Sequence, residues 1–207
     1  MAGAGGVNLG VRLVGRELAQ ARLAAVGRSV EPVIRGTLNT TATKARSERY
    51  VKPMRGLFKS SLLGSSLAGS DIRGRIVVKR AGRNRMNSRV IPSSSSIRVD
   101  DYRTWFFEWI DQTRARIWVM GLGGRKVAAG FVNPSSRGQR PLSTRNSKTS
   151  ARGKTYSKNT ALTAALGPSA AYWFKQLSGS ATIRWTNIFL QQEFERRIRR
   201  EIAKYSR

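Results

Sequence analysis

The spacing of apolar residues changes twice along this chain, and this change sets the class of fold that it can adopt. From Asn8 to Gly27 apolar residues recur every three or four positions, as on one face of a helix. Beyond Asp71 apolar and polar residues alternate, which is typical of strands. The helical spacing returns between Thr182 and Tyr205. Helices at both ends and strands in the middle predict an α+β fold.

Two N-terminal helices are predicted before the strands. The first covers 8–27, and the second begins at Glu31-Pro32, because proline is tolerated in the first turn of a helix. The segment from Tyr50 to Pro53 is expected to end this second helix, and a short third helix is predicted over 54–63. The buried face of the first helix is expected to consist of Val11, Val14, Leu18, Ala21 and Ala25, and that of the second of Val33, Ile34, Leu38, Thr41, Ala42 and Ala45.

A central antiparallel sheet is predicted in the middle of the chain. The segment 72–80 alternates as a strand does, a basic turn follows at 83–89, and further strand is expected at 90–91 and 97–99. A second pair of strands gives the strongest hairpin signal, because two β-rich runs flank the glycine-rich turn Gly121–Gly124. That turn lacks the GxxxxGK[ST] spacing of a phosphate-binding loop, which favours a hairpin turn.

The segment 133–159 interrupts the ordered pattern. It is rich in Ser, Arg, Lys, Gly and Thr and almost without apolar residues, so it is predicted to be a long, flexible basic loop. The whole chain, 1–207, is expected to form one domain that contains this loop. The final segment, 182–205, is predicted to be an amphipathic helix that packs on the sheet. Its apolar face consists of Leu190, Phe194, Ile198, Ile202 and Tyr205.

The balance of charge is extreme. The 207 residues include 39 Lys and Arg against 11 Asp and Glu, which gives a formal net charge of +28. A surface of this kind repels itself unless a polyanion lies against it, so the expected partner is nucleic acid or an acidic protein surface. Hydrophobic residues make up 40% of the chain, which is enough to build a core and excludes general disorder.

Two residue types are absent, and their absence excludes much chemistry. Without Cys or His the chain has no disulfide, no thiolate zinc site and no Ser–His or Cys–His catalytic pair. We therefore expect a protein that is not an enzyme, with no metal, no other cofactor and no small-molecule substrate. No apolar run reaches the roughly 20 residues of a spanning helix, so no membrane partner is expected.

Three basic tracts are the candidates for nucleic-acid contact. They cover Arg73–Arg89, Arg137–Lys158 and Arg196–Arg207, and the first two contain no acidic residue. One such tract is usually a solvated face, but three at this net charge favour sequence-independent contact with phosphates. The residues predicted to face nucleic acid are Arg73, Arg75, Lys79, Arg80, Arg83, Arg85, Arg137, Arg140, Arg145, Lys148, Arg152 and Lys154.

One acidic-aromatic segment, Asp100–Asp111, holds four of the eleven acids. Oxygen ligands of this kind could bind a divalent cation, as in a metal-dependent nuclease acting through Asp100, Asp101, Glu108 and Asp111. Pairing with arginines of the chain itself or of a neighbouring subunit is the favoured interpretation, with the aromatic residues as core or interface anchors. The residues predicted to form a subunit interface are Asp100, Asp101, Trp105, Phe106, Glu108, Trp109, Asp111, Phe194, Ile198 and Ile202.

The order of the motifs resembles a known family. The helical run Leu38–Arg46 is followed by a basic β-rich middle, by a Ser/Arg/Lys-rich insertion opened by Gly130–Asn133, by the turn Gly167-Pro168-Ser169 and by a Phe/Arg-rich terminal helix. In this order, over about Val33 to Ile202, the chain resembles the minor tail protein Z family of tailed bacteriophages and prophages.

This resemblance implies a tail completion protein, a structural component of the virion that helps to finish the tail and join it to the head. It also implies an α+β fold, a homo-oligomeric ring that is six-fold to match the tail, and a place at the head-proximal end of the tail after assembly in the host cytoplasm. The implied partners are tail terminator, tail tube or head–tail connector proteins and phage DNA. The alternative is a cellular basic nucleic-acid-binding protein of ribosomal or nucleoid type.

Overall fold

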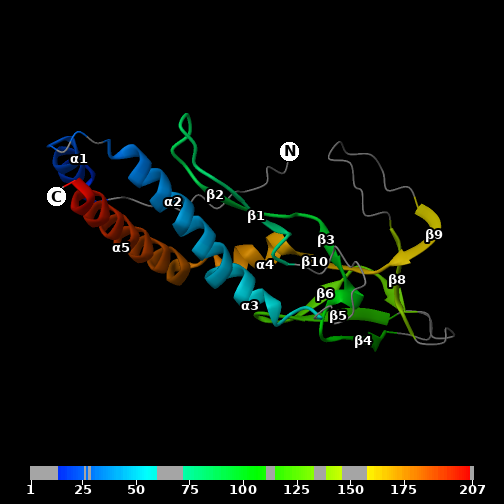
Figure 1. Ribbon diagram of the computed structural model, residues 1–207. Helices are drawn as coiled ribbons and strands as arrows, with labels where there is room; N and C mark the ends of the chain where they lie inside the picture. Colours follow the sequence, from blue (N-terminus) through cyan, green and yellow to red (C-terminus); the bar gives the residue numbers. More distant parts are fainter. Residues whose placement is uncertain are drawn as a thin grey trace. The chain divides into compact units, whose positions relative to one another are not determined.

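The computed structural model (Figure 1) describes residues 14–25, 27, 29–59, 72–110, 115–132, 139–145 and 158–205. These residues divide into two compact units, and each is described by itself. The helical unit contains the described residues up to Tyr50 together with Ile76–Ile91 and those from Leu177 onward. The sheet unit contains the described residues of Val51–Arg75 and Pro92–Gln176. The α+β class predicted from the sequence is confirmed.

The helical unit is built on a bundle of helices. Its elements are α1 (Arg16–Ala25), α2 (Glu31–Ala45), a π-helix over Arg46–Val51 that continues α2, α5 (Ser180–Tyr205), and the hairpin strands β1 (Ile76–Lys79) and β2 (Arg89–Pro92). Helix α5 packs against α2 and α1, and Figure 1 shows the three helices side by side. The core between them consists of Ala19, Leu23, Val30, Val33, Phe194 and Ile198, with Ile34 and Ile202 packed against it.

The sheet unit contains three small antiparallel sheets. Their strand orders are β4-β5-β6, β7-β8-β9 and β10-β3. The elements are α3 (Lys52–Arg55), β3 (Ser96–Arg98), a 3₁₀ turn (Val99–Asp101), β4 (Trp105–Trp109), β5 (Ala115–Gly121), β6 (Gly124–Ala128), β7 (Phe131–Val132), β8 (Pro141–Arg145), β9 (Lys158–Ala164), β10 (Leu166–Ser169) and α4 (Ala170–Leu177).

The core of the sheet unit forms around Trp173 of α4. This indole is fully buried, and its Nε1–H donates to the Tyr102 hydroxyl at 3.0 Å, which in turn donates to the Pro168 carbonyl at 2.7 Å. Gly121, at the end of β5, leaves the space that the indole occupies, because a methyl group there would overlap the ring. Helix α4 is thereby fixed to the face of β5 that carries the buried Ile117 and Val119.

Several sequence predictions agree with these elements. The predicted hairpin around the glycine-rich turn is present, since β5 pairs antiparallel with β6 and Gly121 lies opposite Gly124. A strand forms at Ile76–Lys79, within the predicted strand 72–80, and a turn follows it, in agreement with the predicted basic turn at 83–89. Among the described residues, no helix is both long enough and apolar enough to cross a bilayer.

The helix predictions need three corrections. Val14 and Leu18 are 65% and 58% exposed, and α1 buries Ala19 and Leu23 instead, because contact with α5 selects a different face. The second helix does not end between Tyr50 and Pro53. It continues through the π-helix, and the proline lies in the first turn of α3, where its missing N–H is no loss. No third helix begins at position 54, because α3 ends at Arg55 and Phe58 forms a β-bridge with Tyr102. Positions 60–63 of that prediction lie outside the described residues.

Two further corrections concern the packing of helix α5 and a strand within the predicted loop. Helix α5 packs on helices α2 and α1 rather than on a sheet, because the apolar faces of these helices meet in one core. Strand β8 lies inside the predicted loop 133–159 and pairs with both β7 and β9. Its backbone hydrogen bonds need no apolar run, so hydrophobic periodicity does not reveal it. The positions 133–138 and 146–157 of that loop lie outside the described residues.

Candidate nucleic-acid interface

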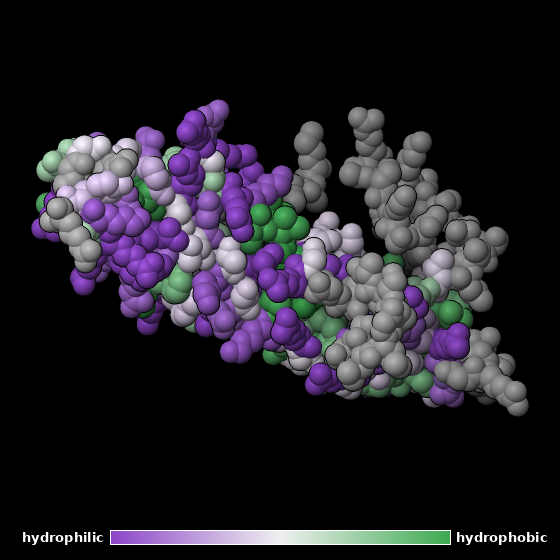
Figure 2. All heavy atoms as spheres, in the orientation of Figure 1, coloured by the Kyte–Doolittle hydropathy of each residue, from purple (hydrophilic) through white to green (hydrophobic). Residues whose placement is uncertain are grey.

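The hairpin β1–β2 presents a cluster of cations from the helical unit. Its turn closes at Gly82 and Arg85, where the Gly82 N–H donates to the Arg85 carbonyl at 3.0 Å and the Arg85 N–H donates back at 3.3 Å. Figure 2 shows the part of the hairpin near this turn as strongly hydrophilic. We call the following residues the hairpin cations: Lys79, Arg80, Arg83, Arg85 and Arg89.

The hairpin cations are exposed and uncompensated. All five side chains lie on exposed residues, and no acidic residue occurs between Lys79 and Arg89. Within the part of the chain that the structure describes, none of the five has an ion pair or a hydrogen bond from its side chain. Guanidinium and ammonium groups in this state are free to bind phosphate oxygens.

Asn39 of α2 holds the hairpin in place. Its Oδ1 accepts hydrogen bonds from the Ala81 N–H at 2.7 Å and from the Ser88 hydroxyl at 2.6 Å, and its Nδ2 donates to the Ala81 carbonyl at 3.2 Å. One amide side chain therefore binds both arms of the hairpin, just before and just after the turn. Ala81 is buried by this contact. The cations are thus carried by a hairpin with a defined attachment to a helix.

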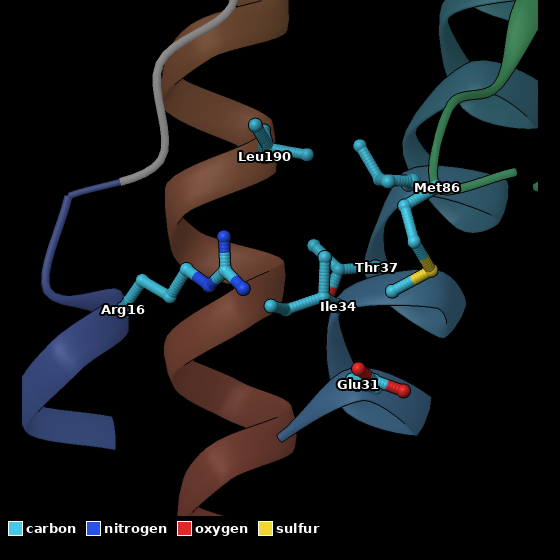
Figure 3. Close-up of a pocket in the computed structure, with 7 residues that line it drawn as sticks. Arg16, Glu31, Ile34, Thr37, Met86 and Leu190 are labelled. Carbon is cyan, nitrogen blue, oxygen red and sulfur yellow. The ribbon is translucent and has the colours of Figure 1, made fainter. Parts of the chain in front are cut away.

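A pocket of about 230 Å³ lies beside this attachment (Figure 3). Figure 3 shows Met86 of the hairpin on the α2 side of the pocket and Arg16 extending from α1 toward Ile34. The lining combines residues of the hairpin with residues of α1, α2 and α5. The pocket is lined by Arg16, Glu31, Ile34, Thr37, Leu38, Met86 and Leu190.

The cations of α5 are in a different state, because glutamates of the same helix neutralise many of them. Glu193 accepts from Arg196 Nε at 2.8 Å and from Arg197 Nε at 2.7 Å, and the Arg197 Nη2 also donates to Thr40 of α2 at 2.9 Å. These hydrogen bonds, led by that of Arg196, lower the pKa of Glu193.

Farther along α5, two more ion pairs repeat this pattern. Arg199 lies 4.0 Å from Glu195, and Lys204 lies 3.5 Å from Glu201. The two basic tracts therefore differ in a way that their sequences do not reveal. The tract in α5 carries its own counter-charges, whereas the hairpin cations have none among the described residues.

The remaining residues predicted to face nucleic acid lie outside the hairpin in the sequence. Arg73 and Arg75 belong to the sheet unit, where Arg75 Nη1 donates to the Ser95 carbonyl at 3.3 Å. Arg140 is exposed beside β8. Arg145 lies in β8, and its side chain is outside the described part of the structure. Four others also lie outside the described residues, namely Arg137, Lys148, Arg152 and Lys154.

The described carboxylates of the acidic-aromatic segment do not form a cluster. Asp100 pairs with Arg98 at 3.5 Å, and Asp101 is buried. Glu108 accepts from Arg125 at 2.8 Å and from the Trp118 indole N–H at 3.0 Å. Asp111 lies outside the described residues. Among the described residues, no group of three His, Cys, Asp or Glu side chains could hold a metal ion.

The residues predicted to form a subunit interface fall into two groups. Trp105, Phe106 and Trp109 lie in β4 and are partly or well exposed. Phe194 and Ile198, in contrast, are only 2% and 8% exposed in the core of the helical unit, and Ile202 packs against the same core. This second group is a correction: the helices of the chain itself bury Phe194 and Ile198 and partly bury Ile202.

Asn39 belongs to the candidate site, and the sequence did not identify it. Its partners in the hairpin lie about 40 positions away along the chain, with a separation of 42 for Ala81. No local pattern marks it, because an asparagine on an amphipathic helix ordinarily faces water. Arg89 belongs to the basic tract but not to the predicted set, and it completes the hairpin cations.

Comparison of this chain with protein-family models, with curated proteins and with solved structures gives no match. The geometry of the hairpin and the order of the sequence motifs therefore carry the functional argument, and the minor tail protein Z family stays a resemblance.

Proposed function

We propose that this chain is a structural protein that binds the nucleic-acid backbone through the hairpin cations. The observation that carries the proposal is that these cations, in a chain with a net charge of +28, have no counter-charge among the described residues. Phosphate groups supply that counter-charge, and release of condensed counterions from nucleic acid drives the association.

The attachment of the hairpin supports its contact with phosphates. The cations follow one another around a two-stranded ribbon, and Asn39 fixes this ribbon to α2. A ribbon attached in this way meets the phosphates without first having to be ordered, which lowers the cost of binding. Phosphate contacts position a protein but carry no sequence information, so binding is expected to be independent of sequence.

Paired charge variants test this proposal. Arg83→Ala/Arg85→Ala removes two uncompensated cations from the hairpin, and Arg199→Ala/Lys204→Ala removes two ion-paired cations from α5, so both variants lose the same charge. The hairpin variant is expected to bind duplex DNA roughly tenfold more weakly at fixed salt, and the α5 variant to bind almost as the unchanged chain does. Fluorescence anisotropy measures both affinities, and equal losses in the two variants would contradict the proposal.

The family resemblance suggests where this binding is used. We propose that the chain is a tail completion protein at the head-proximal end of a phage tail, with DNA and the proteins of the tail terminator, tail tube or connector as partners. Immunogold labelling of purified tailed particles from the strain that encodes the chain should place the label at the head–tail junction. Label at the distal tip, or intact particles without the chain, would contradict this role.

A further inference from the structure

Among the residues that the structure describes, strand β4 forms an edge of its sheet and pairs on one side only. The order β4-β5-β6 leaves β4 with one neighbour, and Figure 1 shows it as the outermost strand of the three. Four of its five residues are aromatic, in the sequence WFFEW. The first three residues are half-buried, and Glu108 and Trp109 are exposed. Natural edge strands are usually protected by lysine, proline or a bulge, and β4 has none of these.

The hydrogen-bond pattern shows which backbone groups face outward. The Met120 N–H donates to the Thr104 carbonyl at 3.0 Å, so Thr104 and the residues two and four positions later bond to β5. The alternation of an antiparallel ladder directs the N–H and C=O groups of Trp105, Phe107 and Trp109 away from β5. Among the described residues, these groups have no partner.

The same three residues place their side chains on one face. Trp105 stacks on Phe107 with ring centroids 6.4 Å apart, and Phe107 meets Trp109 edge-on at 5.1 Å. This row borders the buried part of β5, because Trp105 lies opposite Val119 and Phe107 opposite Ile117. Trp109 is 45% exposed. An added strand would therefore extend both the hydrogen-bond ladder and an aromatic face.

The charge on β4 indicates what can bind there. In a chain with 39 Lys and Arg, Trp105–Trp109 contains neither, so the strand itself places no cation between two paired copies. The one acid, Glu108, is held by Arg125 and Trp118 on the opposite face of the sheet. Because the strand has no cation, it cannot pair with the phosphates of nucleic acid. Its one charged side chain, Glu108, is already ion-paired, so the strand presents no unpaired charge that would favour a different, charged protein partner.

We propose that β4 pairs antiparallel with β4 of a second copy of this chain, centred on Phe107. In this register all five residues are paired, with Trp105 opposite Trp109 of the partner subunit and Phe107 opposite the partner's Phe107. The aromatic rows of the two copies therefore lie on the same face of the joined sheet. Two three-stranded sheets would then join into one continuous sheet. The contact is isologous, so it produces a dimer, whereas the six-fold ring implied by the resemblance needs a head-to-tail contact.

Cysteine cross-linking tests the pairing and its register. The chain contains no Cys, so single substitutions report only on their own position. Phe107→Cys should form a covalent dimer on mild oxidation, because paired Cα atoms about 5.5 Å apart suit a disulfide. A mixture of Trp105→Cys and Trp109→Cys should cross-link as well, and each of these alone should not. The control is Val127→Cys on β6, a 55% exposed position away from the proposed contact.

The masses of the species in solution give an independent test if a cysteine variant fails to fold. Trp109→Lys places two cations in the contact and should raise the dimer dissociation constant about tenfold, whereas Val127→Lys should leave it unchanged. Light scattering across a concentration series measures this. Arg83→Ala/Arg85→Ala should dimerise normally, because the hairpin takes no part.

The proposal is overturned if Phe107→Cys and Val127→Cys cross-link at the same slow rate, or if Trp105→Cys alone cross-links as fast as the mixture. A chain that stays monomeric at roughly 100 μM would also overturn it, since a specific contact of this size should be populated there. An assembly that forms equally well with Trp109→Lys would do the same. None of these results would affect DNA binding by the hairpin, so the two proposals can fail separately.

Discussion

Glu193 binds two arginines at once inside the helical unit. The residue is 6% exposed, and its carboxylate accepts hydrogen bonds from Arg196 and Arg197, the second of which also reaches Thr40 on α2. A buried carboxylate held by charged donors stabilises the fold only while it is ionised. Glu193 thereby reduces the repulsion between two neighbouring arginines of α5. One of them, Arg197, also connects α5 to α2.

The lowered pKa of Glu193 predicts a specific dependence of stability on pH. A carboxyl group whose pKa is lower in the folded state contributes stability above its unfolded pKa, and this contribution is lost as the pH falls through the folded value. Glu193→Gln should lower the free energy of unfolding by about 2 kcal/mol at pH 7. The difference from the unchanged chain should shrink below pH 4.5, the ordinary value.

Urea unfolding at pH 7, 5 and 3.5 measures this difference. Glu195→Gln is the matched control, because that side chain is 53% exposed and lies 4.0 Å from Arg199, so its loss should change stability by less than about 0.5 kcal/mol. If the two variants lose the same stability, or if the loss in Glu193→Gln persists at pH 3.5, the role given to Glu193 is wrong.

Individual residues could be predicted from the sequence where their role depends on their own chemistry. Arg83 and Arg85 are exposed cations, as a basic turn predicts. Asn39 could not be predicted, because its role arises from a hairpin that returns to α2 from far along the chain. Phe194 was misassigned to a subunit interface for a related reason. An apolar helix face indicates that something covers it, but only the fold shows that α1 and α2 do so.

At the level of secondary structure, the hairpin β1–β2 is attached to helix α2. The Asn39 side chain accepts hydrogen bonds from Ala81 and Ser88 and donates one to Ala81, and these bonds connect the helix to the hairpin. The proposed binding of phosphates benefits from this order, because a fixed hairpin loses less entropy when it binds.

Asn39→Ala is expected to loosen the hairpin without removing a cation. The hairpin amides, beginning with that of Ala81, should exchange hydrogen faster, and the affinity for duplex DNA should fall several-fold. Hydrogen exchange followed by mass spectrometry measures the first effect. The control is Thr43→Ala, because the Thr43 hydroxyl, one turn farther along α2, donates only to the Asn39 carbonyl of its own helix at 2.8 Å. Unchanged exchange in Asn39→Ala would show that the Asn39 hydrogen bonds do not hold the hairpin in place.

The elements that the sequence predicted well are those with a local cause. The hairpin around Gly121–Gly124 forms where glycine and β-rich runs require it. The register of α1 and the continuation of α2 past Tyr50 depend on tertiary contacts, and both were predicted wrongly. Strand β8 was missed because its pairing with β7 and β9 uses backbone groups, which composition does not report.

At the scale of the whole molecule, the net charge of +28 divides into unlike parts. Many cations of α5 are bound by glutamates of the same helix, the hairpin cations have no described counter-charge, and β4 carries no cation at all. The sequence alone predicted a polyanion partner from the total charge. The structure adds a candidate site for that partner and a separate candidate site for a second copy of the chain.

The salt dependence of DNA binding is the sharpest test of phosphate binding by the hairpin cations. The logarithm of the association constant should fall linearly with the logarithm of salt concentration, and each phosphate contact adds about 0.9 to the slope. Arg83→Ala/Arg85→Ala should therefore reduce the slope by about two, while Arg199→Ala/Lys204→Ala should leave it unchanged. A slope that is flat for the unchanged chain, or that falls equally in both variants, would contradict the account.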